Sequence, residues 1–245
     1  MRAPYLVRLR RGGRRLPRVN LSKASSAFVE VERLTHQPTG SGQPVLRGCD
    51  FAAPGHGLIL VCGRSGCGKS SLLHVLSGLN EPLSGRVRVG HDARAHTPAH
   101  TRSQLCGLVF QFPERHFIGE SVREELLAGH PPSTSLQHQA AQAILSTGLS
   151  DLDMLTHIDT LSGGFKRRLA LAVQLVRSPS LLLLDEPLAG LDFVSRDSIV
   201  SLLSNLSRSQ PVIVRCASRK SSRLITSSQF FFGGMCTSCS LGCDT

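Results

Sequence analysis

The chain has 245 residues, 40 % of them hydrophobic and 18 % charged, and a formal net charge of +11. This length suits one globular unit with an inserted subdomain and leaves no room for a membrane domain. No apolar run approaches the ~18 residues that a membrane helix needs, so any contact with a membrane is expected to come through a partner. No secretory segment precedes the eight cysteines, so a disulfide framework is not expected.

The positive charge lies at the two ends of the chain. Residues 1–29 contain seven Arg and one Lys but no acidic residue, which gives +8, and residues 215–245 give +3. A basic arm can bind nucleic acid, but this arm has only two aromatic residues and no binding module follows it. An Arg-rich, acid-free N-terminus is typical of an organelle transit peptide. We therefore expect residues 1–26 to be a disordered, transit-like arm, and we expect no nucleic-acid partner.

Strand patterns follow the arm. Residues 27–34 alternate in hydrophobicity like an edge strand, and residues 35–44 form a loop rich in Pro and Gly. Residues 45–52 predict another strand, which ends before a Pro-Gly turn. Residues 58–61 form a short apolar run of the kind found in buried strands.

The next stretch fits the phosphate-binding loop pattern G-x-x-x-x-G-K-[ST] without a mismatch. It separates the apolar run from a helix predicted over residues 71–79, so backbone amides and a helix N-terminus gather where they favour a bound anion. Lys69 is expected to reach the β- and γ-phosphates, and the Ser70 hydroxyl is expected to bind Mg²⁺. The residues expected to contact ATP here are Gly63, Arg64, Ser65, Gly66, Cys67, Gly68, Lys69, Ser70 and Ser71.

The middle of the chain predicts two more strands and a helical region. Residues 85–89 and 105–110 are short strands on either side of a polar loop over residues 91–102. One helix is predicted to start at Ser121, which is followed by Glu at the capping-box spacing. A second helix is predicted over residues 135–145, where apolar residues recur at helical spacing.

Two carboxylates end the apolar strand predicted over residues 180–187. Asp185 is expected to hold Mg²⁺, mostly through water, and Glu186 to polarise the water that attacks the γ-phosphorus. Ligands of open α/β sheets bind beyond the carboxyl ends of the strands, so this pair and the glycine loop are expected to lie together. A helix over residues 195–206 and a last strand over residues 211–214 complete the pattern.

The stretch Leu-Ser-Gly-Gly-Phe-Lys-Arg-Arg at residues 161–168 resembles the signature motif of ATP-binding cassette (ABC) ATPases. Other family motifs stand in the same order: Gln111 resembles the Q-loop glutamine, Asp-Glu-Pro at 185–187 the Walker B end, and residues 188–192 the D-loop. The resemblance covers residues 28–214. Within the family, the motifs look like those of energy-coupling-factor and cobalt-type importers, and most like a plant chloroplast type, ABC transporter I family member 11.

The resemblance implies an α/β fold for residues 27–214. A P-loop NTPase core sheet flanked by helices would carry an inserted α-helical subdomain, at about residues 113–178, and a small antiparallel β subdomain. The implied chemistry is Mg²⁺-dependent hydrolysis of ATP. The implied catalytic residues are Glu186, Gln111 and Lys69, and the implied Mg²⁺ ligands are Ser70, Gln111 and Asp185.

Two further contacts follow from the resemblance alone. Ser162, Gly163 and Gly164, at the start of a predicted helix, would cap the γ-phosphate of ATP held by a second subunit. The chain would therefore work as a homodimer or as a heterodimer with another ABC ATPase. By position, His36 would stack on the adenine ring, although a solvated loop histidine is an equal alternative.

The family pattern stops after Val214. A histidine that contacts the γ-phosphate should follow within a few residues, but Ala217 stands near that place and no His occurs after His157. Residues 215–245 are therefore an atypical tail, explained either by an error of reading frame or splicing or by a variant that has lost the switch histidine. Three cysteines in the tail resemble a metal site only loosely and are interpreted as incidental.

The expected function is an ATP-binding and ATP-hydrolysing subunit that energises a membrane-embedded transporter subunit for a small nutrient, such as a metal ion or a vitamin. Two alternatives remain. One is a soluble ABC ATPase that serves assembly or repair, and the other is a binding-only regulatory subunit, which the missing histidine favours. The expected location is the chloroplast, with the cytoplasmic face of a membrane as the alternative.

Overall fold

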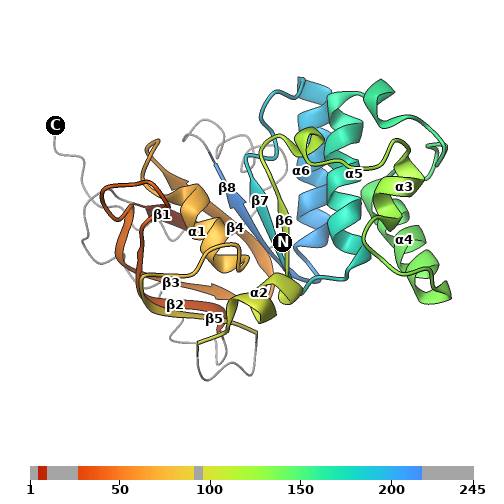
Figure 1. Cartoon of the computed structure of the whole chain (residues 1–245). Helices are drawn as coiled ribbons and strands as arrows, with labels where there is room; N and C mark the ends of the chain where they lie inside the picture. The colour runs from red at the N-terminus through yellow and green to blue at the C-terminus, as the bar shows by residue number, and fades with distance from the viewer. Residues whose placement is uncertain (1–4, 10–26, 91–95, 217–245) are drawn as a thin grey trace.

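Two β-sheets and a group of helices make up the fold (Figure 1). The computed structural model describes residues 5–9, 27–90 and 96–216. Most of the predicted arm and nearly all of the predicted tail, including Ala217, Cys236, Cys239 and Cys243, lie outside these residues.

The larger sheet is parallel and has the strand order β1-β4-β8-β7-β6. Its inner strands β4, β8 and β7 are buried along almost their whole length, which explains why their sequences are continuous apolar runs. Because the strands run in parallel, their carboxyl ends meet at one edge of the sheet. The bounds are β1 (Tyr5–Leu9), β4 (Gly57–Gly63), β6 (Cys106–Val109), β7 (Leu181–Asp185) and β8 (Pro211–Arg215).

Strand β1 lies in the part of the sequence interpreted as a disordered arm. Residues 5–9 pair in parallel with β4, and Val7 is buried in the main core. Gly57 leaves room for the ring of Tyr5, because a Cβ at Gly57 would lie 3.3 Å from Tyr5 Cε2. Residues 5–9 are thus a strand rather than disordered chain, because a short apolar stretch finds backbone partners along the edge of β4.

The smaller sheet is antiparallel and has the order β3-β2-β5. Residues 27–34 were expected at an edge, but β2 is the central strand and pairs with β3 on one side and β5 on the other. Alternating burial shows that one face of a strand is covered, and it does not show how many neighbours the strand has. The strands are β2 (Ala27–His36), β3 (Leu46–Pro54) and β5 (Ser84–Val89).

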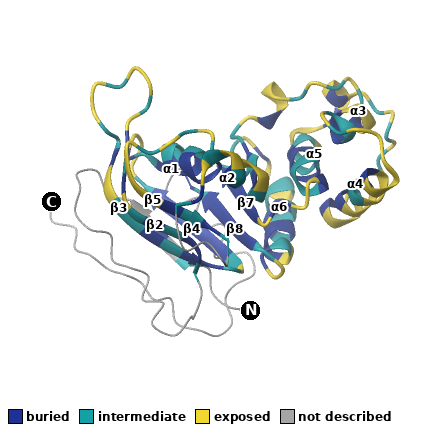
Figure 2. Cartoon of the chain, turned by 60° about the horizontal axis from the view of Figure 1, so that its bottom comes forward, coloured by how far each residue is buried: buried dark blue, intermediate teal, exposed yellow. Residues whose placement is uncertain are grey.

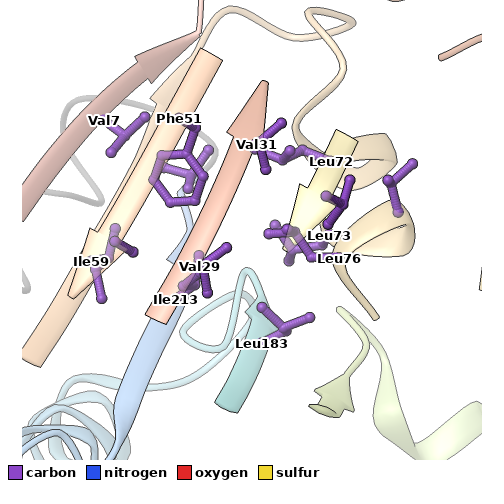
Figure 3. Close-up of a cluster of buried hydrophobic side chains, with 14 of the residues drawn as sticks. Val7, Val29, Val31, Phe51, Ile59, Leu72, Leu73, Leu76, Leu183 and Ile213 are labelled. Atoms are coloured by element: carbon purple, nitrogen blue, oxygen red, sulfur yellow. The ribbon is translucent and has the colours of Figure 1, made fainter. Parts of the chain in front are cut away.

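The main core lies between the two sheets and helix α1 (Lys69–Leu76). Figure 3 shows Val29, Val31 and Phe51 of the small sheet near Ile59, Leu183 and Ile213 of the parallel sheet, with leucines of α1 beside them. This packing fixes the first turn of α1 against the carboxyl edge of the parallel sheet. The leucines that α1 contributes are Leu72, Leu73 and Leu76.

Three helices on the other side of the molecule form a subdomain with a hydrophobic core of their own. They fall within the range predicted for it, and Ser121 caps the first of them through a capping box with Glu124, as their spacing predicted. The outer faces of α3 and α4 are largely exposed, whereas the strands are mostly buried (Figure 2). The elements are η1 (Pro113–Arg115), α3 (Val122–Leu127), α4 (Thr134–Thr147), η2 (Ile158–Thr160) and α5 (Gly163–Val176).

Helix α6 (Phe193–Leu206) packs on the face of the parallel sheet opposite the main core, in a cluster shared with residues of α5. A further short helix, α2 (Ala99–Leu105), lies partly in the stretch predicted as a polar loop. Its anchor is Arg102, whose guanidinium is fully buried and donates to the carbonyl oxygens of Thr97 and Asn80 and to the Glu81 carboxylate. The polar composition of this stretch did not predict a helix, because the buried side chain that anchors it is a charged one.

Candidate functional site

The glycine loop joins β4 to α1, as predicted. Strand β4 ends at Gly63 and α1 begins at Lys69, so the loop lies at the carboxyl end of a buried strand and at a helix N-terminus. Gly66 and Gly68 have positive φ values of 73° and 90°. A Cβ at Gly68 would also lie 2.6 Å from the Leu46 side chain, so this position needs glycine both for its backbone and for its space.

Lys69 is held over the loop by the loop's own backbone. Its side chain is buried, and its ammonium group donates to the carbonyl oxygens of Gly63 (2.8 Å) and Arg64 (2.9 Å), with Cys67 Sγ at 4.0 Å. These contacts fix a positive charge beside the loop amides. The arrangement can bind a chain of phosphate groups, since charge and amides both favour an anion.

The predicted carboxylates lie at the end of β7, beside β6. Asp185 is the last residue of β7, and Glu186 follows with a φ of 47°, a conformation that non-glycine residues seldom adopt. Gln111 Nε2 donates to Glu186 Oε2 over 3.0 Å, so two predicted catalytic residues 75 positions apart are in direct contact. The amide thereby fixes one oxygen of the carboxylate expected to orient water.

Arg215 also contacts this pair, and no motif of the sequence analysis included it. Its guanidinium lies 2.5 Å from Asp185 Oδ1 and 2.9 Å from Glu186 Oε1. The register of β7 and β8 sets Asp185 opposite Arg215, and the backbone N–H of Glu186 donates to the carbonyl oxygen of Arg215. The available signal was the pairing of two predicted parallel strands, which places the residue after Val214 beside Asp185.

Helix α5 begins where the signature stretch predicts. Ser162 is its N-cap, with the hydroxyl accepting from the backbone N–H of Phe165 at 3.4 Å. A Cβ at Gly164 would lie 2.8 Å from the Ser195 hydroxyl, so this glycine allows α5 to approach α6 closely. Among the described residues, no hydrogen bond joins Ser162, Gly163 or Gly164 to the phosphate-binding loop. The start of α5 is thus a second helix N-terminus, a place that favours a bound anion.

Arg167 is a second residue that sequence reasoning missed. It is buried, and its guanidinium donates to the carbonyl oxygens of Gln111 (2.6 Å) and Ala189 (3.2 Å). Burial lowers the pKa of Arg167, and the nearby Glu114 carboxylate opposes that shift. One side chain of the signature helix therefore ties together the backbones that carry the predicted Q-loop and D-loop.

A family model described as ABC transporter matches residues 46–189, the stretch that carries the glycine loop, Gln111, the signature helix and the Asp185–Glu186 pair. The chain belongs to the ABC transporter family. Both the predicted family and the predicted α/β fold are confirmed. Membership implies an ATP-binding ATPase subunit of a transporter.

Relatives of known identity include ABC transporter family proteins from a plant and from bacteria. The chain is 36 % identical over 212 residues to the chloroplastic ABC transporter I family member 11 of Arabidopsis thaliana, covering 82 % of this chain and 76 % of that protein. It is 35 % identical over 158 residues to the energy-coupling factor transporter ATP-binding protein EcfA2 of Acetivibrio thermocellus, covering 63 % of this chain and 56 % of that protein.

A solved structure gives the same result at the level of fold. The structure of cbiO1 from Clostridium perfringens, part of the ABC transporter complex cbiONQ, matches with a TM-score of 0.72 and 25 % identity. The match covers 82 % of each chain. No helix among the described residues of this ABC ATPase has both the length and the hydrophobicity that crossing a membrane requires.

His36, the predicted adenine contact, is buried at the end of β2 in this ABC ATPase. Only 4 % of the residue is exposed. Its Nδ1 donates a hydrogen bond to the carbonyl oxygen of Glu81 over 3.2 Å. A ring packed in this way has no free face for a base. Stacking on adenine would therefore require the loop around His36 to open.

The donor set of the predicted Mg²⁺ site fits that ion. Mg²⁺ takes oxygen ligands and is usually held by one or two protein groups together with phosphates and water. Ser70 lies in the first turn of α1 and supplies a hydroxyl, Gln111 an amide oxygen and Asp185 a carboxylate. Among the described residues, no group of three or more His, Cys, Asp or Glu side chains could hold a metal ion.

His74 of α1 lies close enough to Asp185 for the carboxylate charge to affect its pKa. Burial lowers the pKa of His74, while the Asp185 charge acts in the opposite direction and His36 adds to the lowering. The His74 ring also meets Phe110 edge-on, with centroids 6.1 Å apart. The phosphate loop's helix, the Walker B strand and the residue before Gln111 thus share one neighbourhood.

Proposed function

We propose that the chain binds MgATP and hydrolyses it to drive a membrane-embedded transporter subunit. The observation that carries this proposal is the convergence of three motifs at the carboxyl edge of one parallel sheet. Lys69 lies over the glycine loop at the end of β4, and Gln111 bonds to Glu186 at the end of β7. Sites of this fold class form at that edge.

The chain's own residues would act mainly by positioning and by balancing charge. The loop amides and Lys69 would hold the phosphates, and Glu186 would orient the attacking water while Gln111 fixes its carboxylate. A Mg²⁺ ion held by Ser70, Gln111 and Asp185 would neutralise charge on the phosphates. Arg167 would keep Gln111 in place through its backbone carbonyl.

A second subunit would complete each site. The N-terminus of α5, with Ser162 as its N-cap and Gly163 and Gly164 in its first turn, suits the γ-phosphate of ATP on a facing chain. We infer a head-to-tail homodimer or heterodimer that ATP closes and hydrolysis opens. Exposed Phe112 and Ile118 follow Gln111 closely, and they are the apolar surface through which this movement would reach the membrane subunit.

The cargo we propose is a small nutrient such as a metal ion or a vitamin, and the location we propose is the chloroplast. Support comes from the names of the relatives, one an energy-coupling factor protein and one chloroplastic. The transit-like charge of residues 1–26 supports the same location. The cytoplasmic face of another membrane is the alternative.

Phosphate release from MgATP tests the proposal directly. The purified chain is assayed alone and with membrane proteins that co-purify with it and are identified by mass spectrometry. We expect hydrolysis that increases when the membrane subunit is present. Absence of both ATP binding and hydrolysis under all these conditions would refute the proposal.

Two observations favour a second function, that of a binding-only regulatory subunit. Arg215 is paired with both carboxylates at the proposed catalytic position, and no histidine follows His157 in the sequence. A chain of this kind would bind ATP with ordinary affinity and close onto a partner ATPase without hydrolysing its own nucleotide. Mixed dimers in which only one chain carries Glu186→Gln would distinguish the two functions by their remaining activity.

A further inference from the structure

Arg215 lies between two nearly buried carboxylates of the proposed site. Its side chain is 15 % exposed, and the side chains of Asp185 and Glu186 are 10 % and 13 % exposed. One guanidinium thus contacts, in a nearly buried setting, the carboxylate expected to serve Mg²⁺ and the carboxylate expected to orient water. Ion pairs are screened much less in such surroundings than on the surface.

The position of Arg215 is fixed by the backbone and not only by its charge. Strand β8 pairs with β7 so that Arg215 lies opposite Asp185, and the Arg215 carbonyl oxygen accepts from the Glu186 N–H at 3.1 Å. On its other side β8 pairs with β4, where Arg215 lies opposite Val61. The guanidinium therefore reaches both carboxylates from a strand end held in place on two sides.

We propose that Arg215 acts as a built-in counter-ion that lowers the affinity of the site for Mg²⁺. This inference rests on the proposed function. A guanidinium and a divalent cation cannot both take full advantage of the Asp185 carboxylate, because they compete for its oxygens and repel each other at close range.

The same contact has a consequence for Glu186. Its two oxygens are each engaged, one by Gln111 Nε2 and the other by the Arg215 guanidinium. A carboxylate held in this way is less available to accept a proton from water. Release of Arg215 would therefore do two things together, opening Asp185 to the metal and freeing an oxygen of Glu186.

The test measures metal affinity in the full chain, with Mn²⁺ as a spectroscopic substitute for Mg²⁺ and a non-hydrolysable ATP analogue. Free Mn²⁺ is followed by electron paramagnetic resonance in the wild type, Arg215→Gln and Arg215→Lys. We expect Arg215→Gln to tighten Mn²⁺ binding by about tenfold, because a unit charge next to the ligand is removed. Arg215→Lys keeps the charge and should stay near the wild type.

Two outcomes would overturn the inference. Unchanged Mn²⁺ affinity in Arg215→Gln would mean that the ion pair does not compete with the metal. Weaker binding of the ATP analogue in Arg215→Gln, measured in EDTA without metal, would mean that Arg215 is a phosphate ligand instead. Melting temperatures of both variants check the fold, and Arg215→Met serves as a second neutral variant if Arg215→Gln is unstable.

The same measurements separate this inference from the proposed function. If the wild type binds the analogue in EDTA and only the metal affinity fails to respond to Arg215, the proposed function stands and the counter-ion role falls. If the wild type does not bind the analogue with or without metal, both fall together.

Discussion

The carboxyl end of β4 and the carboxyl ends of β7 and β8 differ in where their functional residues come from in the sequence. At the end of β4, the anion side, residues 63–70 form a binding loop from one continuous stretch. At the ends of β7 and β8, the carboxylate side, Asp185 and Glu186 are held by Arg215 and Gln111 from distant parts of the chain. Local sequence thus determines the first half of the site, and strand pairing determines the second.

The largest expected effect separates catalysis from binding on the carboxylate side. Glu186→Gln keeps the size of the side chain and its contact with Gln111, but an amide cannot polarise water. We expect turnover to fall by about 10²- to 10⁴-fold, with binding of MgATP retained and a closed dimer accumulating, as light scattering would show. Wild-type turnover in this variant would place the base elsewhere.

The next effect probes the anion side. Lys69→Ala removes the ammonium group that is held over the loop carbonyls of Gly63 and Arg64. A charged hydrogen bond contributes about 1.5–3 kcal/mol, so affinity for an ATP analogue should fall by about 10- to 100-fold in isothermal titration calorimetry. Arg208→Ala removes an exposed charge far from the motifs and serves as the control. Equal affinity in wild type and Lys69→Ala would contradict the assignment of the loop.

A third variant tests the connection between the two sides and the signature helix. Arg167→Met would leave the carbonyl oxygens of Gln111 and Ala189 without their buried donor. We expect a loss of about 1–3 kcal/mol in the free energy of unfolding, measured in urea. The exposed Arg177 makes one such bond, to the Ser103 carbonyl oxygen, and Arg177→Met should cost less than about 0.5 kcal/mol. Equal losses would show that Arg167 has no special role.

The smallest effect concerns His74, which lies between the two sides. Burial lowers its pKa below the ordinary value, so the unfolded chain takes up the proton first as pH falls, and the fold loses stability below about pH 6.5. The histidine is half-buried, so the effect is discounted for solvent screening and we expect less than about 1 kcal/mol. His74→Gln should flatten the decrease in stability between pH 7 and pH 5, and an unchanged slope would assign that decrease to other groups.

Sequence reasoning succeeded where a motif is contiguous. The loop around Lys69, the end of β7, the start of α5 at Ser162 and the capping box at Ser121 all lie where expected, because each depends on residues within one or two helical turns. The family pattern also placed Gln111 next to the carboxylates. These are short-range rules of backbone geometry and capping.

Sequence reasoning failed where a residue acts over distance. Three arginines bind groups that are far away in sequence: Arg102, Arg167 and Arg215. The residues next to them in the sequence do not predict that their guanidinium groups are buried. The central place of β2 and the strand at residues 5–9 depend in the same way on which strand lies alongside. His36 followed the family pattern by position, but its burial is set by packing around Glu81.

Strand β1 lies within residues 1–26, the segment that we propose to be transit-like. A cleavage that removed residues 1–26 would take away β1 and leave the backbone N–H and C=O groups along one side of β4 without partners. Exposed strand edges recruit other strands. The shortened chain would therefore be more prone to associate than the full one through the uncovered edge of β4.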